Sequence, residues 1–145
     1  GDYLTTARSE ICLLAQVENQ KGMDALDDIL TVDGVDGVFV GPSDLAADMG
    51  FIGQAGAAEV KAAVVDAMTK IVASGKAAGI LTLDTELQQQ CRDIGATFIA
   101  SEIDVTLFAR NMRGAAKDAA ERLRETQATT GHYQIKPLET GRATL

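Results

Sequence analysis

Short apolar runs alternate along the chain with longer segments in which apolar residues recur every three or four positions. The apolar runs are rich in aliphatic and β-branched residues and therefore predict buried strands. The longer segments predict amphipathic helices, because one side of each would be apolar and the opposite side polar. We expect strands at residues 11–17, 37–40, 79–83 and 97–100.

Polar residues that can cap a helix mark where several of the helices are expected to begin. Asn19 and Asp104 are placed to cap two of them, and Thr85 with Gln88 matches the Thr-x-x-Gln capping box. Glycines follow the helices that we expect to end near residues 49, 74 and 94. The expected helices cover residues 23–30, 45–49, 59–74, 85–94 and about 105–124.

Strands that alternate with helices predict an α/β protein with a parallel sheet and right-handed crossovers. Such units could form a small open sheet or half of an eight-stranded barrel, which typically needs about 250 residues. Periodicity leaves both architectures open. Residues 1–10 are polar and carry no strand pattern, and residues 126–145 are polar with Gly131, Pro137 and Gly141 as breakers. We expect the latter segment to be a C-terminal arm or tail.

The formal net charge of −8 disfavours nucleic acid as a partner, since phosphate binding needs clustered Lys and Arg residues. No apolar run approaches the roughly 20 residues of a membrane helix, and residues 1–10 lack the plan of a signal peptide. Cys12 and Cys91 lie in apolar patterns and are expected to be buried free thiols. These features favour a cytoplasmic, enzyme-like domain with neither nucleic acid nor membrane as a partner.

Two carboxylates lie where expected strands end. Glu18 directly follows the first strand, and Asp44 follows the second strand after a Gly-Pro-Ser turn. The C-terminal ends of parallel strands share one edge of a sheet, where ligands bind. We therefore expect Glu18 and Asp44 to converge on one hard divalent cation. The alternative is that each acid caps the helix after its strand by accepting backbone N–H groups.

The turn at residues 41–43 could aim backbone N–H groups at an anion such as a carboxylate. Gly-Pro is also an ordinary turn signal, so the turn alone does not define a site. His132 is the single histidine and lies in the polar tail, where we expect it to be exposed to solvent. Arg110 and Arg113 on the last expected helix are better explained as surface or subunit contacts than as catalytic groups.

The segments Gln16–Asn19 and Gly34–Leu45 closely resemble the metal-dependent pyruvate aldolases of the HpcH/HpaI type. That family includes 4-hydroxy-2-oxoheptanedioate and 2-keto-3-deoxy-sugar-acid aldolases. The stretch GVDGVFVGPSDL is the most specific part of a similarity that covers roughly residues 3–124. Further matching segments are Met49–Gly50, Gly75–Lys76, Gly79–Leu81 and Gly95–Phe98.

The resemblance implies a (β/α)₈ barrel, of which residues 1–125 would form the C-terminal half. It implies reversible cleavage of a 4-hydroxy-2-oxo acid to pyruvate and an aldehyde, with a divalent metal as Lewis acid. Glu18 and Asp44 match the metal ligands, with Mg²⁺ or Mn²⁺ expected first and Co²⁺ or Zn²⁺ as alternatives. The residues that match substrate-binding positions are Gln16, Gly41, Pro42, Ser43 and Leu81.

Two departures from the family pattern qualify this expectation. Family members use an arginine and a histidine from a preceding half-barrel, and no residue here matches either, so we expect little activity from the chain alone. We expect it to form a homo-oligomer or to associate with such a first half. Ser101–Asp104 also replaces a stretch that is usually small and rich in glycine. A citrate-lyase-like acyl-CoA lyase and a non-catalytic barrel fragment remain as alternative functions.

Overall fold

Four parallel strands form the framework of the computed structural model, which describes residues 1–130. They pair in chain order, and every neighbouring pair is parallel. The predicted α/β class, built from parallel β/α units, is therefore confirmed. The strands are β1 (Leu14–Val17), β2 (Gly37–Val40), β3 (Ala77–Leu81) and β4 (Phe98–Ala100).

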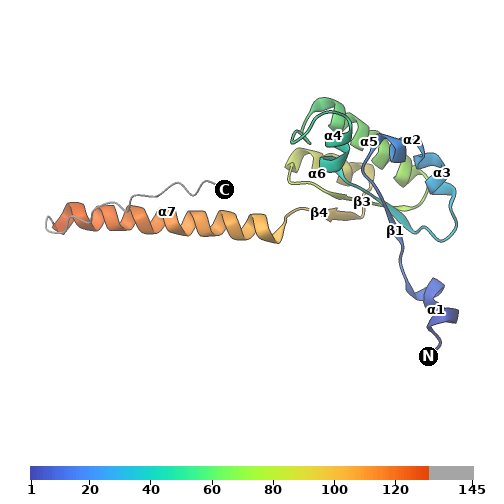
Figure 1. Ribbon diagram of the computed structural model, residues 1–145, viewed down its shortest axis with the longest axis horizontal. Coiled ribbons are helices and arrows are strands. Elements are labelled where there is room, and N and C mark those ends of the chain that lie inside the picture. The colour runs from blue at the N-terminus through green and yellow to red at the C-terminus, as the bar shows by residue number, and fades with distance from the viewer. Residues whose placement is uncertain (131–145) are drawn as a thin grey trace. The chain divides into compact units, whose positions relative to one another are not determined.

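Helices α2 to α6 lie together on one side of this sheet (Figure 1). The hydrophobic core forms between these helices and the sheet, where Val38 and Ile80 of the strands and Met68 of α5 are fully buried. Burial of such side chains contributes about 1.5–3 kcal/mol each, so this layer provides most of the driving force for folding. The helices are α2 (Gln20–Asp24), α3 (Leu26–Thr31), α4 (Pro42–Asp48), α5 (Ala58–Ala73) and α6 (Thr85–Ile94).

The first strand is shorter than the apolar run that predicted it. The backbone N–H of Ile11 donates to the last turn of an unexpected helix, α1 (Tyr3–Glu10), and so belongs to the end of that helix. Pairing with β2 begins only near Leu13, whose N–H donates to the Asp36 carboxylate and whose carbonyl accepts from the Asp36 N–H. The apolar run at residues 11–17 therefore contains the end of α1 at its start and β1 at its end.

The two cysteines lie in different environments. Cys91 on α6 is buried as a free thiol, as predicted, and burial raises its pKa above the ordinary value. Cys12 is an exposed free thiol, so the prediction that it is buried was wrong. It lies between the end of α1 and the start of β1.

Helix boundaries follow local capping and differ from the prediction in several places. The helix expected at residues 23–30 is split at Ala25 into α2 and α3, although Asn19 caps α2 as predicted by accepting from the Gly22 N–H at 2.7 Å. Helix α4 begins at Pro42 instead of Leu45, because proline suits the first position of a helix.

Helix α6 begins at Thr85 as predicted, but its cap differs from the prediction. Its cap is Asp84, whose side chain accepts from the backbone N–H groups of Glu86 and Leu87, so the capping box predicted for Thr85 and Gln88 was wrong. Gln88 instead donates its side-chain amide to the Thr82 carbonyl at 2.7 Å.

Helix α7 (Asp104–Thr130) forms a separate unit that begins after Ile103. It continues past the end expected near Arg124, and the rest of the expected C-terminal arm lies outside the described residues. Its Val105, Phe108, Met112 and Leu123 are exposed. None of the helices in residues 1–130 is both long and apolar enough to cross a bilayer.

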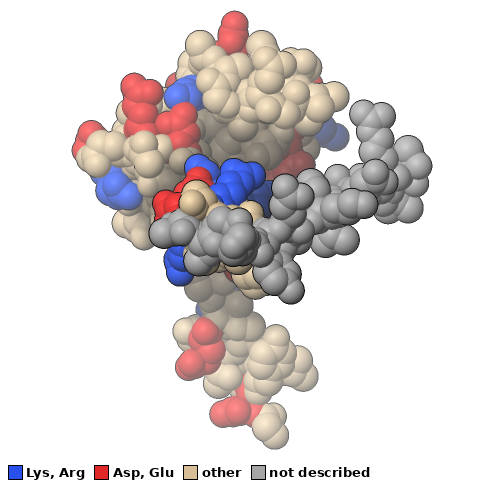
Figure 2. Space-filling view, turned by 90° about the vertical axis from the view of Figure 1, so that its left-hand side faces the viewer, with Lys and Arg blue, Asp and Glu red and all other residues tan. Residues whose placement is uncertain are grey.

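Acidic and basic side chains are interspersed on the face of the molecule shown in Figure 2. The expectation that nucleic acid is not a partner rests on the net charge of −8 and stays a prediction.

The sheet face opposite the helices carries an aromatic pair above a glycine. The rings of Phe39 and Phe98 meet edge to face with centroids 5.3 Å apart. In the register Phe39 pairs with Gly79, and Gly79 pairs with Phe98. A Cβ on Gly79 would lie 2.6 Å from the Phe39 ring, so the glycine provides the space that the rings occupy.

We predict that Gly79→Ala lowers the free energy of unfolding by about 1–3 kcal/mol, the usual cost of overpacking a filled site. The added methyl group would have to displace the Phe39 ring. Gly56→Ala is the matched control, because a Cβ there meets no atom within 4 Å, and it should change stability by less than about 0.5 kcal/mol. Urea denaturation measures the free energy of unfolding of both variants and of the natural chain. Equal stabilities of the two would contradict this account of the sheet face.

Candidate functional site

The ends of β1 and β2 place Glu18 beside Gly41. Val17 pairs with Val40 in the parallel register, and the Gly41 N–H donates to the Val17 carbonyl at 3.0 Å. The next residue along β1 is Glu18, so its side chain leaves the strand directly opposite Gly41. The sheet register therefore fixes where this carboxylate lies.

The Glu18 side chain occupies the space that a side chain at position 41 would need. A Cβ there would lie 2.9 Å from both the Cβ and the Oε2 of Glu18, and 3.4 Å from the Nε2 of Gln16. The backbone φ of Gly41 is −104°, which any residue can adopt, so the requirement for glycine is steric. The absence of a Cβ allows the Glu18 carboxylate to lie against the turn between β2 and α4.

Gln16 orients this carboxylate. Its side-chain amide donates from Nε2 to the Oε2 of Glu18 at 2.6 Å. The two residues are separated by one position, and alternate residues of a strand point to the same face of the sheet. Gln16 and Glu18 therefore act as a pair whose geometry is set by β1.

Asp44 lies in the first turn of α4, three residues after Gly41. The turn is closed by the Leu45 N–H, which donates to the Gly41 carbonyl at 3.0 Å. The Asp44 side chain is exposed, and no hydrogen bond or ion pair joins it to another residue in the described part of the chain. Its oxygens are therefore available to a ligand.

The alternative role of the two acids as helix caps finds no support. Asn19, and not Glu18, caps α2, and α4 has no side-chain cap hydrogen bond. Within residues 1–130 there is no group of three or more His, Cys, Asp or Glu side chains arranged for a metal ion. Two carboxylates are nevertheless a donor set that suits Mg²⁺, whose other ligands are usually water and substrate oxygens. The metal site therefore stays a prediction, which the chemistry of these two donors fits.

A cavity of about 340 Å³ adjoins the same turn. Pro42, Ser43 and Leu81 all line it, so the structure brings three of the predicted substrate-binding residues together. Gln16 and Gly41 lie instead with Glu18. The remaining lining residues are Gly53, Ala55, Gly56, Thr82, Leu83, Asp84 and Ile103.

Asp84 is a cavity residue that the sequence analysis missed. It directly follows the strand expected at residues 79–83, as Glu18 follows the strand expected at residues 11–17, so the same sequence signal marks both acids. In the structure β3 ends at Leu81, three residues before Asp84. Its side chain caps α6 and lines the cavity at the same time.

Lys61 of α5 forms an ion pair with Asp84. Its Nζ lies 2.5 Å from Oδ2 of Asp84 and 3.6 Å from Oε2 of Glu86. The hydrogen bond from Lys61, together with the N–H of Leu87, lowers the pKa of Asp84 below its ordinary value. The same bond raises the pKa of Lys61. Both groups therefore stay charged throughout the physiological pH range.

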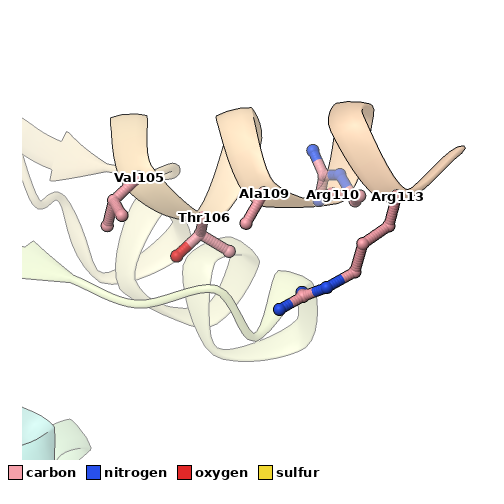
Figure 3. A pocket seen from close by; sticks show the side chains of 5 residues that line it. All are labelled: Val105, Thr106, Ala109, Arg110 and Arg113. Atoms are coloured by element: carbon pink, nitrogen blue, oxygen red, sulfur yellow. The ribbon is translucent and has the colours of Figure 1, made fainter. Parts of the chain in front are cut away.

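A second hollow lies along α7 and contains none of the predicted site residues. It is lined by Val105, Thr106, Ala109, Arg110 and Arg113 (Figure 3). These positions recur every three or four residues, so they share one side of the helix. His132 lies outside the described residues.

Comparison with known proteins identifies relatives along most of the chain. The profile of the HpcH/HpaI aldolase/citrate lyase family matches residues 4–111. The chain is 54% identical over 112 residues to a hydroxypyruvate/pyruvate aldolase of Roseovarius nubinhibens, covering 77% of this chain and 44% of the relative. It is 46% identical to a 4-hydroxy-2-oxo-heptane-1,7-dioate aldolase of Salmonella paratyphi B, covering 83% of this chain and 46% of the relative.

A solved structure supports the same relationship. An HpcH/HpaI aldolase/citrate lyase family protein from Burkholderia cenocepacia superposes with a TM-score of 0.74 at 34% identity. The match covers 82% of this chain and 46% of that protein. The chain thus spans a little under half the length of these relatives, which agrees with the prediction of half a barrel.

We predict that the Lys61–Asp84 pair makes stability depend on pH in acid. Because folding lowers the pKa of Asp84, the stabilisation is fully present above the ordinary value of 3.8 and is lost as pH falls through the lowered value. Asp84→Asn keeps a capping side chain but removes the charge. The difference in melting temperature between the natural chain and this variant should therefore shrink below about pH 4. A difference that stays constant from pH 7 to pH 2 would contradict the prediction.

Proposed function

The chain belongs to the HpcH/HpaI aldolase/citrate lyase family, and we propose that its site serves the metal-dependent cleavage of a 4-hydroxy-2-oxo acid to pyruvate and an aldehyde. Glu18 and Asp44 would hold a divalent ion, Mg²⁺ or Mn²⁺ in the first place. When bound, such an ion polarises the carbonyl of the 2-oxo acid and offsets the negative charge that develops during C–C cleavage.

The observation that carries this proposal is the packing of Gly41 against Glu18. A turn without a Cβ lets a carboxylate and a small substrate approach the same backbone segment. Asp44 follows within the next helical turn, and its oxygens have no competing partner among the described residues. Neither Glu18 nor Asp44 acts as a helix cap, because Asn19 caps α2 and α4 has no side-chain cap hydrogen bond.

The other residues have roles that follow from their positions. Gln16 holds the Glu18 carboxylate in one orientation. Ser43, which is exposed at the cavity, would bind the carboxylate of pyruvate together with the backbone of its turn. Leu81 gives the cavity an apolar wall against which the carbon chain of the aldehyde part can pack.

The acyl-CoA lyase alternative receives no support from the cavity. Binding the phosphates of CoA calls for Lys or Arg side chains near the site. The part of the chain that the structure describes contributes neither residue to the cavity lining. The aldolase proposal therefore stands as the better supported of the two enzyme functions.

We predict that Asp44→Asn weakens Mn²⁺ binding by at least about tenfold, because even the loss of an outer partner of a metal ligand has that effect. The enhancement of water proton relaxation by Mn²⁺ measures the affinity. Asp48→Asn, one turn further along α4, makes the same change in charge and keeps an acceptor for the Gln20 N–H, so it is the control. Equal Mn²⁺ affinities of the natural chain and Asp44→Asn would disprove the ligand assignment.

The match covers only 44% of the Roseovarius aldolase, so the activity is tested in a chimera that supplies the rest of that protein. Residues 4–111 replace the matching segment of that aldolase, and a coupled assay follows release of pyruvate from a 4-hydroxy-2-oxo acid. We expect turnover that a chelator abolishes and that Glu18→Gln lowers by about hundredfold or more, since the ion supplies several kcal/mol of charge stabilisation. A Glu18→Gln chimera as active as its parent would refute the proposed function.

A further inference from the structure

The separation of Glu18 and Asp44 depends on how α4 is held, because the two acids lie on different segments. Glu18 follows β1 directly, and the sheet register fixes its place. Asp44 lies on α4, so its place depends on how that helix is turned about its own axis. A divalent ion needs ligand oxygens at defined distances, and Mg²⁺ tolerates little departure from them. The contacts that fix the rotation of α4 therefore bear on the metal site.

Asp48 joins the end of α4 to the start of α2. Its Oδ2 accepts from the backbone N–H of Gln20 at 2.7 Å, and its carbonyl accepts from the side-chain Nε2 of Gln20 at 3.3 Å. The two residues are 28 positions apart in the chain. In residues 1–130 no other hydrogen bond joins α2 to α4. Asp48 and Gln20 are therefore the polar link between the two helices.

The same contact sets which way Asp44 faces. Residues four apart share one side of a helix, so Asp44 and Asp48 lie on the same side of α4. Leu45, one position after Asp44, is fully buried in the core. The Asp48 side of α4 contacts Gln20, which lies two residues after Glu18. The hydrogen bonds therefore turn the Asp44 side of the helix toward the segment that carries Glu18.

Packing alone leaves α2 and α4 incompletely joined. A hollow of about 250 Å³ lies among α2, α4 and α5, and its lining includes Met23 of α2 and Leu45 and Met49 of α4. Closely packed side chains would hold two helices in one orientation without further bonds. Because these helices border a hollow, the bonds between Asp48 and Gln20 restrict the rotation of α4.

We propose that Asp48 is a positioning residue of the metal site, which acts through the Gln20 N–H to set the separation of Glu18 and Asp44. The inference rests on the proposed function, because that function assigns the ion to these two acids. It adds a residue that is not itself a ligand. Loss of the Asp48 bond lets α4 turn, and the two carboxylates then meet one ion less often.

The test measures Mn²⁺ affinity of the full chain by water proton relaxation. Asp48→Ala removes the acceptor and should weaken binding by about fivefold, the factor to which the net contribution of one hydrogen bond corresponds. Asp48→Asn removes the same charge but keeps an acceptor, so its affinity should stay within about twofold of the natural one. Equal losses in the two variants would mean that the charge of Asp48 matters and its bond does not, which overturns the inference.

Gln20→Pro removes the donor of the same bond. Gln20 is the first residue of α2, where proline is well tolerated, and Asn19 before it is extended, as the residue before a proline should be. This variant should weaken Mn²⁺ binding about as much as Asp48→Ala. The double variant should bind no more weakly than either single one, since both changes break one interaction. Additive losses would show that the two residues act separately, against the inference.

Asp36→Ala is the matched control for a general loss of stability. Asp36 also joins two segments by accepting a backbone N–H, that of Leu13 at 2.6 Å, but at the opposite end of β1 and β2. Urea denaturation should show a similar loss of stability for Asp36→Ala and Asp48→Ala. Mn²⁺ affinity of Asp36→Ala should stay within about twofold of the natural value, because distant sites act independently. A fivefold loss there would make the effect of Asp48 a matter of stability and overturn the inference.

The remaining outcomes separate this inference from the proposed function. An unchanged affinity in Asp48→Ala overturns the inference even if the chimera releases pyruvate. The expected pattern of affinities together with an inactive chimera upholds the positioning role and removes the aldolase function. A natural chain that binds no Mn²⁺, or one in which Asp44→Asn binds it equally well, overturns the inference, since no pair of ligands is then left to position.

Discussion

The Glu18 carboxylate can lie against the end of β2 because Gly41 has no Cβ, and the rest of the candidate site depends on this contact. The register of β1 with β2 sets the position of Glu18, the Gly41 carbonyl starts α4, and α4 carries Asp44. Ser43 lies in the same turn and faces the cavity. A shift in register by one residue would separate all of these groups, because it would turn Glu18 to the other face of the sheet.

Asp84 shows how one side chain can both cap a helix and line a cavity. Its Oδ1 accepts from the backbone N–H groups at the start of α6, and its Oδ2 pairs with Lys61. The hydrogen bond from Lys61 also lowers the pKa of Asp84, so the cap stays ionised. Replacement of Asp84 therefore changes the start of α6 and the charge of the cavity lining together.

The sequence predicted the framework well, because strands covered by helices have unbroken apolar runs and glycines end the helices. Glu18, Ser43 and Asp44 were predicted as site residues from the same runs, since Glu18 follows the first run directly and the other two follow the second after Gly41 and Pro42, and their roles stay predictions. Three kinds of feature could not. The exposure of Cys12 depends on a helix end that competes with a strand for the same apolar residues. The cap at Asp84 depends on which of two neighbouring polar residues reaches the N–H groups. The steric need for Gly41 and Gly79 depends on contacts between strands, which the residue pattern along one strand does not contain.

The strand order has a consequence for how the sheet forms. Every strand pairs with the strand that precedes or follows it in the chain, as in the contacts of Leu14 with Gly37 and of Gly79 with Phe98. Each pairing joins residues 19 to 40 positions apart, because a parallel strand has to be reached through a crossover. The loop-closure entropy of each crossover is lost before the strand contacts form, so such a sheet forms more slowly than a helical bundle of the same size. Since the pairs follow the chain order, the sheet can still grow one β/α unit at a time, with each new strand added to an edge that already exists.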